Sequence, residues 1–194
     1  GEICAQVNFP PGAQSPSLGY STLIGGYNND AGVRIAVDTA GGIYVAGETH
    51  KDASGRNFPI LNPIAQNGAS HQGLSDIFVL KMVQTASGPL ALQYSTLIGS
   101  PNFDNVSELR VDSTGSVVIT GLTGSGTEGL PLVNPLPGGT LSVNFIARLV
   151  FQTNQLSLAY STRMASPSTY VYSVDFDSSG NTWIAGGGPL PATE

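Results

Sequence analysis

The chain has 194 residues, of which 40% are hydrophobic and only 10% are charged, and its formal net charge is −6. This length and apolar content suffice for one domain with a core. The acidic balance argues against nucleic-acid binding, which needs a basic surface, and no apolar run reaches the roughly 20 residues of a membrane span. The 25 Gly and 13 Pro disfavour long helices and favour short strands joined by turns.

The first expected strand is an alternating apolar run, which occurs three times. The copies are GEICAQV at 1–7, DIFVLKM at 76–82 and VNFIARL at 143–149. Aligned in one frame, they place Gln6, Lys81 and Arg148 at the same position. Cys4, the only cysteine, lies in the first copy, so an internal disulfide and a cysteine-based zinc site are excluded. We expect Cys4 to be a small apolar strand residue, with an intermolecular bridge or an anchoring thiol as the alternative.

The second expected strand carries the motif Tyr-Ser-Thr. It reads YSTLIG at 20–25 and at 94–99, and in degraded form YSTRMA at 160–165. Its tyrosines, Tyr20, Tyr94 and Tyr160, could stack on sugars, as could Trp183, but we expect all four to be core aromatics.

A two-strand segment with a tight turn follows each Tyr-Ser-Thr motif. Its copies are VRIAVDTAGGIYVAGET at 33–49, SELRVDSTGSVVITGLT at 107–123 and YSVDFDSSGNTWIAGG at 172–187. The turn aspartates, Asp38, Asp112 and Asp177, lie 18, 18 and 17 residues after the preceding motif tyrosine. We expect each aspartate to cap its own turn, with calcium binding as the alternative, and each turn glycine to supply a positive φ.

These segments divide the chain into three tandem modules, 1–75, 76–142 and 143–194, within a single repeat domain at 1–194. The third stops just after its Leu-Pro element, where a further apolar strand is due. The fold class we expect is all-β, with four-stranded antiparallel blade-like modules in tandem, forming a β-propeller or a partial propeller.

The modules resemble the bacterial SBBP β-propeller repeat family. The resemblance rests on YSTLIGG at 20–26, AVDTAGGIYVAGET at 36–49, NFPILNP at 57–63 and DIFVLKM at 76–82. It implies a propeller fold and a secreted or cell-surface protein, and it brings no catalytic residues. The uncharged polar composition favours the same location. Three modules depart from the larger ring that this resemblance suggests.

Three modules leave apolar blade faces and strand edges uncovered, and such surfaces drive association. We therefore expect the N-terminal strand of one copy to complete the sheet left open near residues 183–194 of another, giving a ring or a filament of identical copies. The assembly strand comprises Glu2, Ile3, Cys4, Ala5, Gln6 and Val7, and extends to Phe9. The alternatives are a fragment of a larger secreted propeller protein, whose further modules close the ring, and a sugar-binding adhesin-type module.

No constellation for catalysis is apparent, so we expect a non-enzymatic structural protein without cofactor or metal. We expect His50 and His71 to lie in solvated loops. The alternative for His50 is metal binding, since Glu48 and Asp52 each lie two residues from it and this spacing can chelate a metal ion. Tyr27 and Phe103 are the candidate ligand contacts in the sugar-binding alternative, whose partners would be glycans, whereas the expected partners are copies of the chain itself. Asn105 begins the Asn-Val-Ser sequon and is the candidate glycosylation site.

Overall fold

A computed structural model describes residues 2–8, 17–52, 58–86, 88–124, 130–138, 143–164, 166 and 168–189, with side chains from Tyr20 onward. The described residues contain strands and no helix, which confirms the all-β prediction. The strands are β1 (Glu2–Asn8), β2 (Ser17–Leu23), β3 (Asp30–Val37), β4 (Ile43–His50), β5 (Ser75–Gln84), β6 (Leu90–Ile98), β7 (Asn105–Val111), β8 (Val117–Leu122), β9 (Asn144–Gln152), β10 (Gln155–Arg163), β11 (Tyr170–Phe176) and β12 (Thr182–Gly187).

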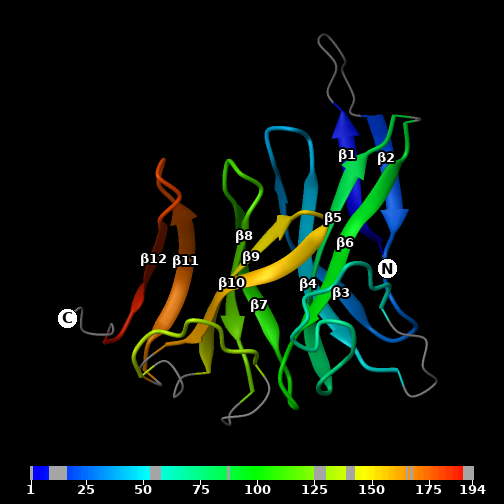
Figure 1. Ribbon diagram of the computed structural model, residues 1–194. Helices are drawn as coiled ribbons and strands as arrows, with labels where there is room; N and C mark the ends of the chain where they lie inside the picture. The colour runs from blue at the N-terminus through cyan, green and yellow to red at the C-terminus, as the bar shows by residue number, and fades with distance from the viewer. Residues whose placement is uncertain are drawn as a thin grey trace.

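The strands form two complete antiparallel sheets and two half sheets. The first sheet has the order β3-β4-β5-β6 and the second has the order β7-β8-β9-β10, each with four strands. The N-terminal pair is β1–β2 and the C-terminal pair is β11–β12, each with two. Figure 1 shows the sheets in a row, with the C-terminal pair at one end and the N-terminal pair at the other.

Each four-stranded sheet draws on two sequence modules. Its first two strands are the turn segment of one module, and its last two are the apolar run and the Tyr-Ser-Thr strand that follow along the chain. The grouping arises because β4 pairs with β5, and β8 with β9, across the long connections between them. The module boundaries at 75/76 and 142/143 therefore fall in the middle of sheets, and the C-terminal pair supplies only the first half of one.

The N-terminal pair supplies the other half of such a sheet. Gln6 pairs with Tyr20 in β1–β2, in the register of Lys81 with Tyr94 in β5–β6 and of Arg148 with Tyr160 in β9–β10. All three ladders have an irregularity beside this pair. The alignment of 1–7 with the other two apolar runs is thus confirmed at the level of the backbone.

Packing between neighbouring sheets builds the core. Because side chains alternate across a strand, Val79 faces the second sheet while Phe78 faces the opposite way. The main cluster joins the first sheet to fully buried residues of the second, including Phe145. A smaller cluster joins the second sheet to Val171 and Val174 of the C-terminal pair.

The three turns have the predicted construction. The Asp38 carboxylate accepts hydrogen bonds from the backbone N–H groups of residues 40 and 42, and Asp112 and Asp177 do the same at 114 and 116, and at 179 and 181. The glycine three residues after each aspartate has a φ between 79° and 83°. These bonds confirm the expected Asx-type turns.

Close backbone contact explains one recurring glycine. A Cβ added to Gly121 would lie 2.0 Å from the Asn105 carbonyl oxygen, and equivalent contacts occur at Gly47 and Gly186. Gly121→Ala would therefore push β7 away from β8, and we expect it to lower the free energy of unfolding by about 1–3 kcal/mol in urea titrations. Ser113→Ala, at an exposed position of the adjacent turn, is the control. Equal stability of the two variants would contradict this account.

Candidate functional site

A polar clasp joins the first sheet to the second at the hairpin turns. The Asp38 carboxylate accepts a hydrogen bond from the Tyr44 hydroxyl (2.9 Å) and pairs with the Lys81 ammonium (3.2 Å). The same hydroxyl lies 3.4 Å from the Gly115 carbonyl oxygen in the turn of the second sheet. Burial and the neighbouring Asp38 carboxylate raise the pKa of Tyr44, so the hydroxyl stays protonated and donates.

The second sheet repeats this clasp toward the C-terminal pair. The Arg148 guanidinium pairs with Asp112 and donates to the Gly180 carbonyl oxygen (2.8 Å). Burial raises the pKa of Asp112, but hydrogen bonds from Thr114 and Ser116 and the charge of Arg148 outweigh it, so the pKa lies below its usual value. The carboxylate is ionised at neutral pH and holds the cation at the seam between the sheets.

The C-terminal pair has a different form of the clasp. Asp177 accepts hydrogen bonds from the indole N–H of Trp183 (3.0 Å) and the side-chain amide of Asn181 (2.8 Å). These bonds, that from Trp183 first, lower the pKa of Asp177 to about 2. Among the described side chains, Lys or Arg pairs with Asp38 and Asp112 but not with Asp177.

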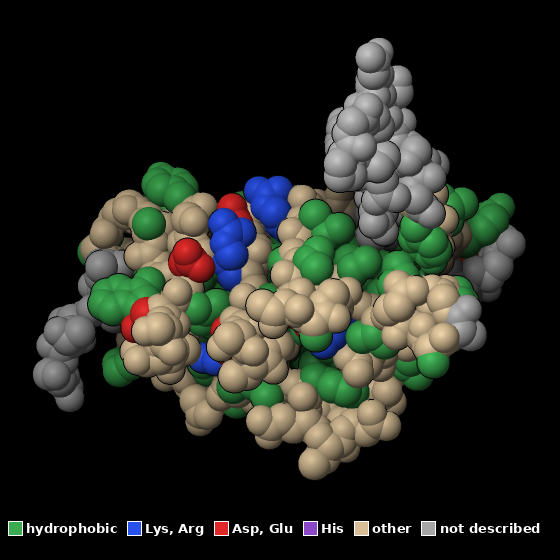
Figure 2. All heavy atoms as spheres, turned by 90° about the horizontal axis from the view of Figure 1, so that it is seen from above, with side chains coloured by type: hydrophobic (Ala, Val, Ile, Leu, Met, Phe, Trp, Pro, Cys, Tyr) green, Lys and Arg blue, Asp and Glu red, His purple; other side chains and the backbone are tan. Residues whose placement is uncertain are grey.

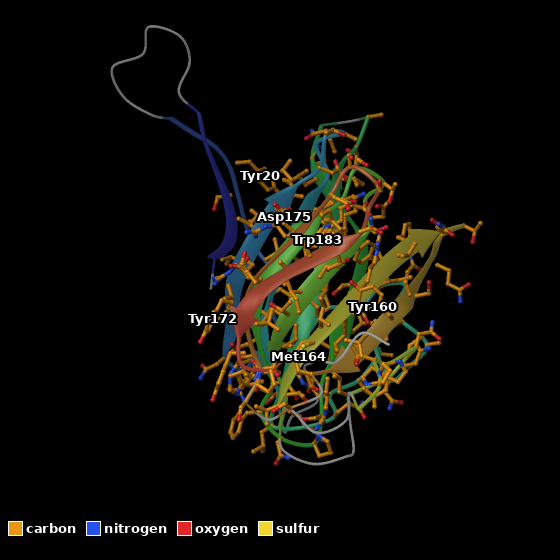
Figure 3. The ribbon with its side chains drawn as sticks, turned by 90° about the vertical axis from the view of Figure 1, so that its left-hand side faces the viewer. Tyr20, Tyr160, Met164, Tyr172, Asp175 and Trp183 are labelled. Carbon is orange, nitrogen blue, oxygen red and sulfur yellow. The ribbon has the colours of Figure 1, made fainter. Side chains whose placement is uncertain are left out.

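The outer face of the C-terminal pair is open. Trp183 takes the position that Tyr44 and Val118 hold after their turns, yet it is 65% exposed while both counterparts are 0% exposed. Tyr172 lies on the same pair and is 68% exposed. Figure 3 looks onto this face, with Tyr172, Asp175 and Trp183 toward the viewer. The prediction of a core role for Trp183 is wrong for a single copy, because no described element covers it.

The first sheet has the complementary open face. Ile35 on β3 is 55% exposed, whereas its counterparts Leu109 and Val174 are 1% exposed because each packs on the preceding sheet. Val37 is also exposed, while its counterpart Val111 is partly buried in the main cluster. The row of sheets therefore ends in two different apolar surfaces, which we call the leading face (Tyr172, Trp183) and the trailing face (Ile35, Val37).

Residues 19–52 match the family model SBBP, the beta-propeller repeat. The matched segment spans β2 to β4 and includes the Asp38 turn and the open β3. The chain carries an SBBP beta-propeller repeat. No curated protein matches it in sequence. Sheets of a propeller cover each other face to face, and the described sheets pack in this way with one face left open at each end of the row, as in a partial propeller.

An open hollow lies between β12 and the second sheet. It measures about 640 Å³ and is lined on the second sheet by Arg148, Tyr160, Thr162 and Met164, and on the C-terminal pair by residues that include Ile184. Figure 3 shows Tyr160 and Met164 beside the C-terminal pair. The hollow is thus bounded by β9 and β10 of the second sheet and by the C-terminal pair.

The corresponding surface of the first sheet is filled by strands. Tyr94, the counterpart of Tyr160, is 1% exposed because its ring packs on Phe151 of β9, with centroids 5.2 Å apart. Leu156 and Leu158 of β10 belong to the same buried cluster. By this comparison the hollow lies against the second sheet at the place that β9 and β10 take against the first sheet.

The residues predicted as ligand contacts lie in loops. Tyr27 and Phe103 are 63% and 59% exposed, and the Phe103 ring lies edge-on to His50 at 6.4 Å. Asn105 is half-buried at the start of β7, where it pairs with Leu122. The residues of the expected assembly strand, Glu2–Val7, lie in β1, and their backbone pairs with β2. Their side chains are outside the described part of the structure, as are Phe9 and residues 190–194.

The two histidines have structural surroundings, and the prediction that both lie in loops is wrong for His50, which is the last residue of β4. The His71 ring nitrogen Nδ1 lies 2.8 Å from the Asp76 carboxylate, and both side chains are buried. Asp76 also accepts from the Gln72 backbone N–H, which ties the loop before β5 to that strand. No group of three or more metal-ligating side chains occurs in the described part of the chain.

Charge and hydropathy add two observations. Viewed from the end with the hairpin turns, acidic and basic side chains lie next to each other among apolar and uncharged surface (Figure 2). Glu108 forms ion pairs with both Arg34 and Arg110. None of the described residues forms a helix with the length and hydropathy to cross a bilayer.

The sequence predicted the N-terminal strand and two uncovered apolar blade faces, but the residues on those faces were not identified. The signal was present in the aligned turn segments, where Trp183 stands at the position of Tyr44 and Ile35 at that of Leu109. Exposure at these positions depends on whether a neighbouring sheet is in place, which alignment alone leaves open.

Proposed function

We propose that this protein is a non-enzymatic structural protomer that assembles with identical copies through its two half sheets. The observation that carries the proposal is their complementarity. β11–β12 corresponds to the first two strands of a complete sheet, and β1–β2 corresponds in register to the last two. Joined between copies, they give the order β11-β12-β1-β2, the same as in the two complete sheets.

The join also covers the exposed apolar surfaces. The N-terminal pair of the incoming copy fills the hollow beside Tyr160, and its first sheet brings the trailing face against the leading face. Apolar area leaves water on both copies, which favours association by about 25 cal/mol per Å² before the costs of association. The contact is heterologous, so repeated joining gives a ring if the rotation closes and a filament if it does not.

We place this assembly outside the cell. The composition supports this location, since charged residues make up 10% of the chain and uncharged polar residues dominate the loops. A structural role at the cell surface also agrees with the turn aspartates and buried histidine, whose hydrogen bonds hold the fold.

Removal of the N-terminal strand tests the proposal. Deletion of residues 1–9 takes away β1, so we expect monomers in light scattering and no rings or filaments in electron micrographs, whereas the full chain assembles. Circular dichroism of both proteins controls for retention of the sheets. Unaltered assembly of the shortened protein would refute the proposal. An intact mass of the native protein that reveals further repeats within the same polypeptide would also refute it.

A further inference from the structure

We propose that the joint between copies forms in a single register, with residue 4 of one copy opposite Ala185 of its neighbour and residue 6 opposite Trp183. This inference rests on the proposed function and specifies how β1 of one copy adds to β12 of the next. It follows from ladders within the chain that already show each half of the pairing.

The two central strands of each complete sheet, β4–β5 and β8–β9, form a ladder that we call the inner ladder. In β4–β5, Tyr44 pairs with Lys81 and Ala46 with Val79. Equivalent residues form the same two pairs in β8–β9. They are Val118 with Arg148 and Thr120 with Ile146. The register is therefore the same in both sheets, although the connections between the strands differ in sequence and length.

The pairing within β1–β2 sets the register of the incoming strand, which is β1 of the next copy. Because Gln6 pairs with Tyr20 as Lys81 pairs with Tyr94, β1 is in phase with β5, and residues 4 and 6 stand at the positions of Val79 and Lys81. On β12, Ala185 and Trp183 stand at the positions of Ala46 and Tyr44. Transferring the inner ladder to β12 and β1 then gives the stated pairs. A shift by one residue would turn every side chain of the added strand to the opposite face.

The polar groups fit this register. Position 6 is Gln, whereas the internal clasps have Lys81 or Arg148 there. A missing cation would leave an unpaired carboxylate at an internal turn, but Asp177 already accepts hydrogen bonds from Trp183 and Asn181. The joint is thus a version of the clasp without a cation, in which hydrogen bonds from Trp183 and Asn181 hold the ionised Asp177 carboxylate and Gln6 adds no second charge opposite Trp183.

A cysteine at position 185 tests the register. Directly opposite residues of antiparallel strands have Cα atoms about 4.5–5.5 Å apart, within the disulfide range of about 4.4–6.8 Å. In Ala185→Cys, the native Cys4 of the neighbouring copy supplies the partner thiol. Mild oxidation should then give disulfide-linked multimers on non-reducing gels, with the 4–185 link identified by mass spectrometry.

Two controls accompany this variant. Ala185→Cys combined with Cys4→Ser removes the partner thiol and should give no such multimers. Asp175→Cys places a thiol at an exposed position on β11, one strand further from the joint, at about 10 Å from the added strand, and should link at least tenfold less.

The outcomes separate the two proposals. Light scattering before oxidation reports whether copies assemble. Assembly without a 4–185 disulfide, or with equal linking of the Asp175→Cys variant, would overturn the register and leave the proposed function intact. Absence of assembly in the unmodified protein would overturn both.

Discussion

A mixture of two variants that cannot assemble alone is expected to form dimers. Trp183→Asp places a charge on the leading face and leaves the trailing face intact, and Ile35→Asp does the reverse. Each variant alone has only one working face per copy, so we expect its self-association to weaken at least ~100-fold, as for a buried unpaired charge at an interface hot spot. In the mixture, the intact leading face of one variant binds the intact trailing face of the other. Size-exclusion chromatography with light scattering should therefore show twice the mass of one copy, and no larger species.

Both substitutions are at exposed positions of a single copy, but Trp183→Asp also removes the hydrogen bond to Asp177, so thermal unfolding of each variant is the control for loss of the C-terminal pair. Ser113→Asp, which adds the same charge at an exposed turn position on neither face, should assemble like the unmodified protein. An isologous contact between two leading faces predicts the opposite pattern, with dimers of Ile35→Asp alone and no gain on mixing. Dimers of either variant by itself would thus contradict a head-to-tail joint.

Much of the fold follows from the repeated segments. Each turn is specified locally, because an aspartate and a glycine three residues later are sufficient to form it, and this holds at Asp38, Asp112 and Asp177 alike. The strands around these turns follow from alternation and β-branched residues. The alignment of Gln6 with Lys81 follows from repetition alone and is confirmed by the register of β1–β2.

The grouping of strands into sheets could not be obtained in the same way. Pairing of β4 with β5 joins residues separated by a long connection, and no local signal specifies such a ladder. The candidate site also depends on contacts between segments that are far apart in the sequence. Whether Trp183 is core or surface depends on a sheet that the single chain does not place over it. Tyr27 and Phe103 were singled out from the sequence as ligand contacts, and the structure shows only that both are exposed in loops.

The Asp112 clasp should dominate stability between the second sheet and the C-terminal pair. Asp112→Ala removes the hydrogen bonds to Thr114 and Ser116 and leaves Arg148, mostly buried, without its counter-charge. Removing one partner of such a pair costs more than the pair itself contributes, and we expect a loss of about 3 kcal/mol in free energy of unfolding at pH 7. Urea titration of the Ile35→Asp background measures this loss without a contribution from assembly.

The same variant should respond to pH with a definite sign. The pKa of Asp112 is lower in the folded protein than its ordinary value of 3.8, so its contribution is complete above that value and is lost as pH falls through the folded pKa. The stability gap between Asp112→Ala and its background should therefore be widest near pH 7 and narrow below about pH 4. Asp177→Ala is the control, since its turn has the same backbone bonds and further bonds from Trp183 and Asn181, but no described Lys or Arg side chain pairs with it and no described sheet covers it. It should lose less stability than Asp112→Ala; equal losses would mean that the turn bonds, and not the contact across the seam, account for the effect.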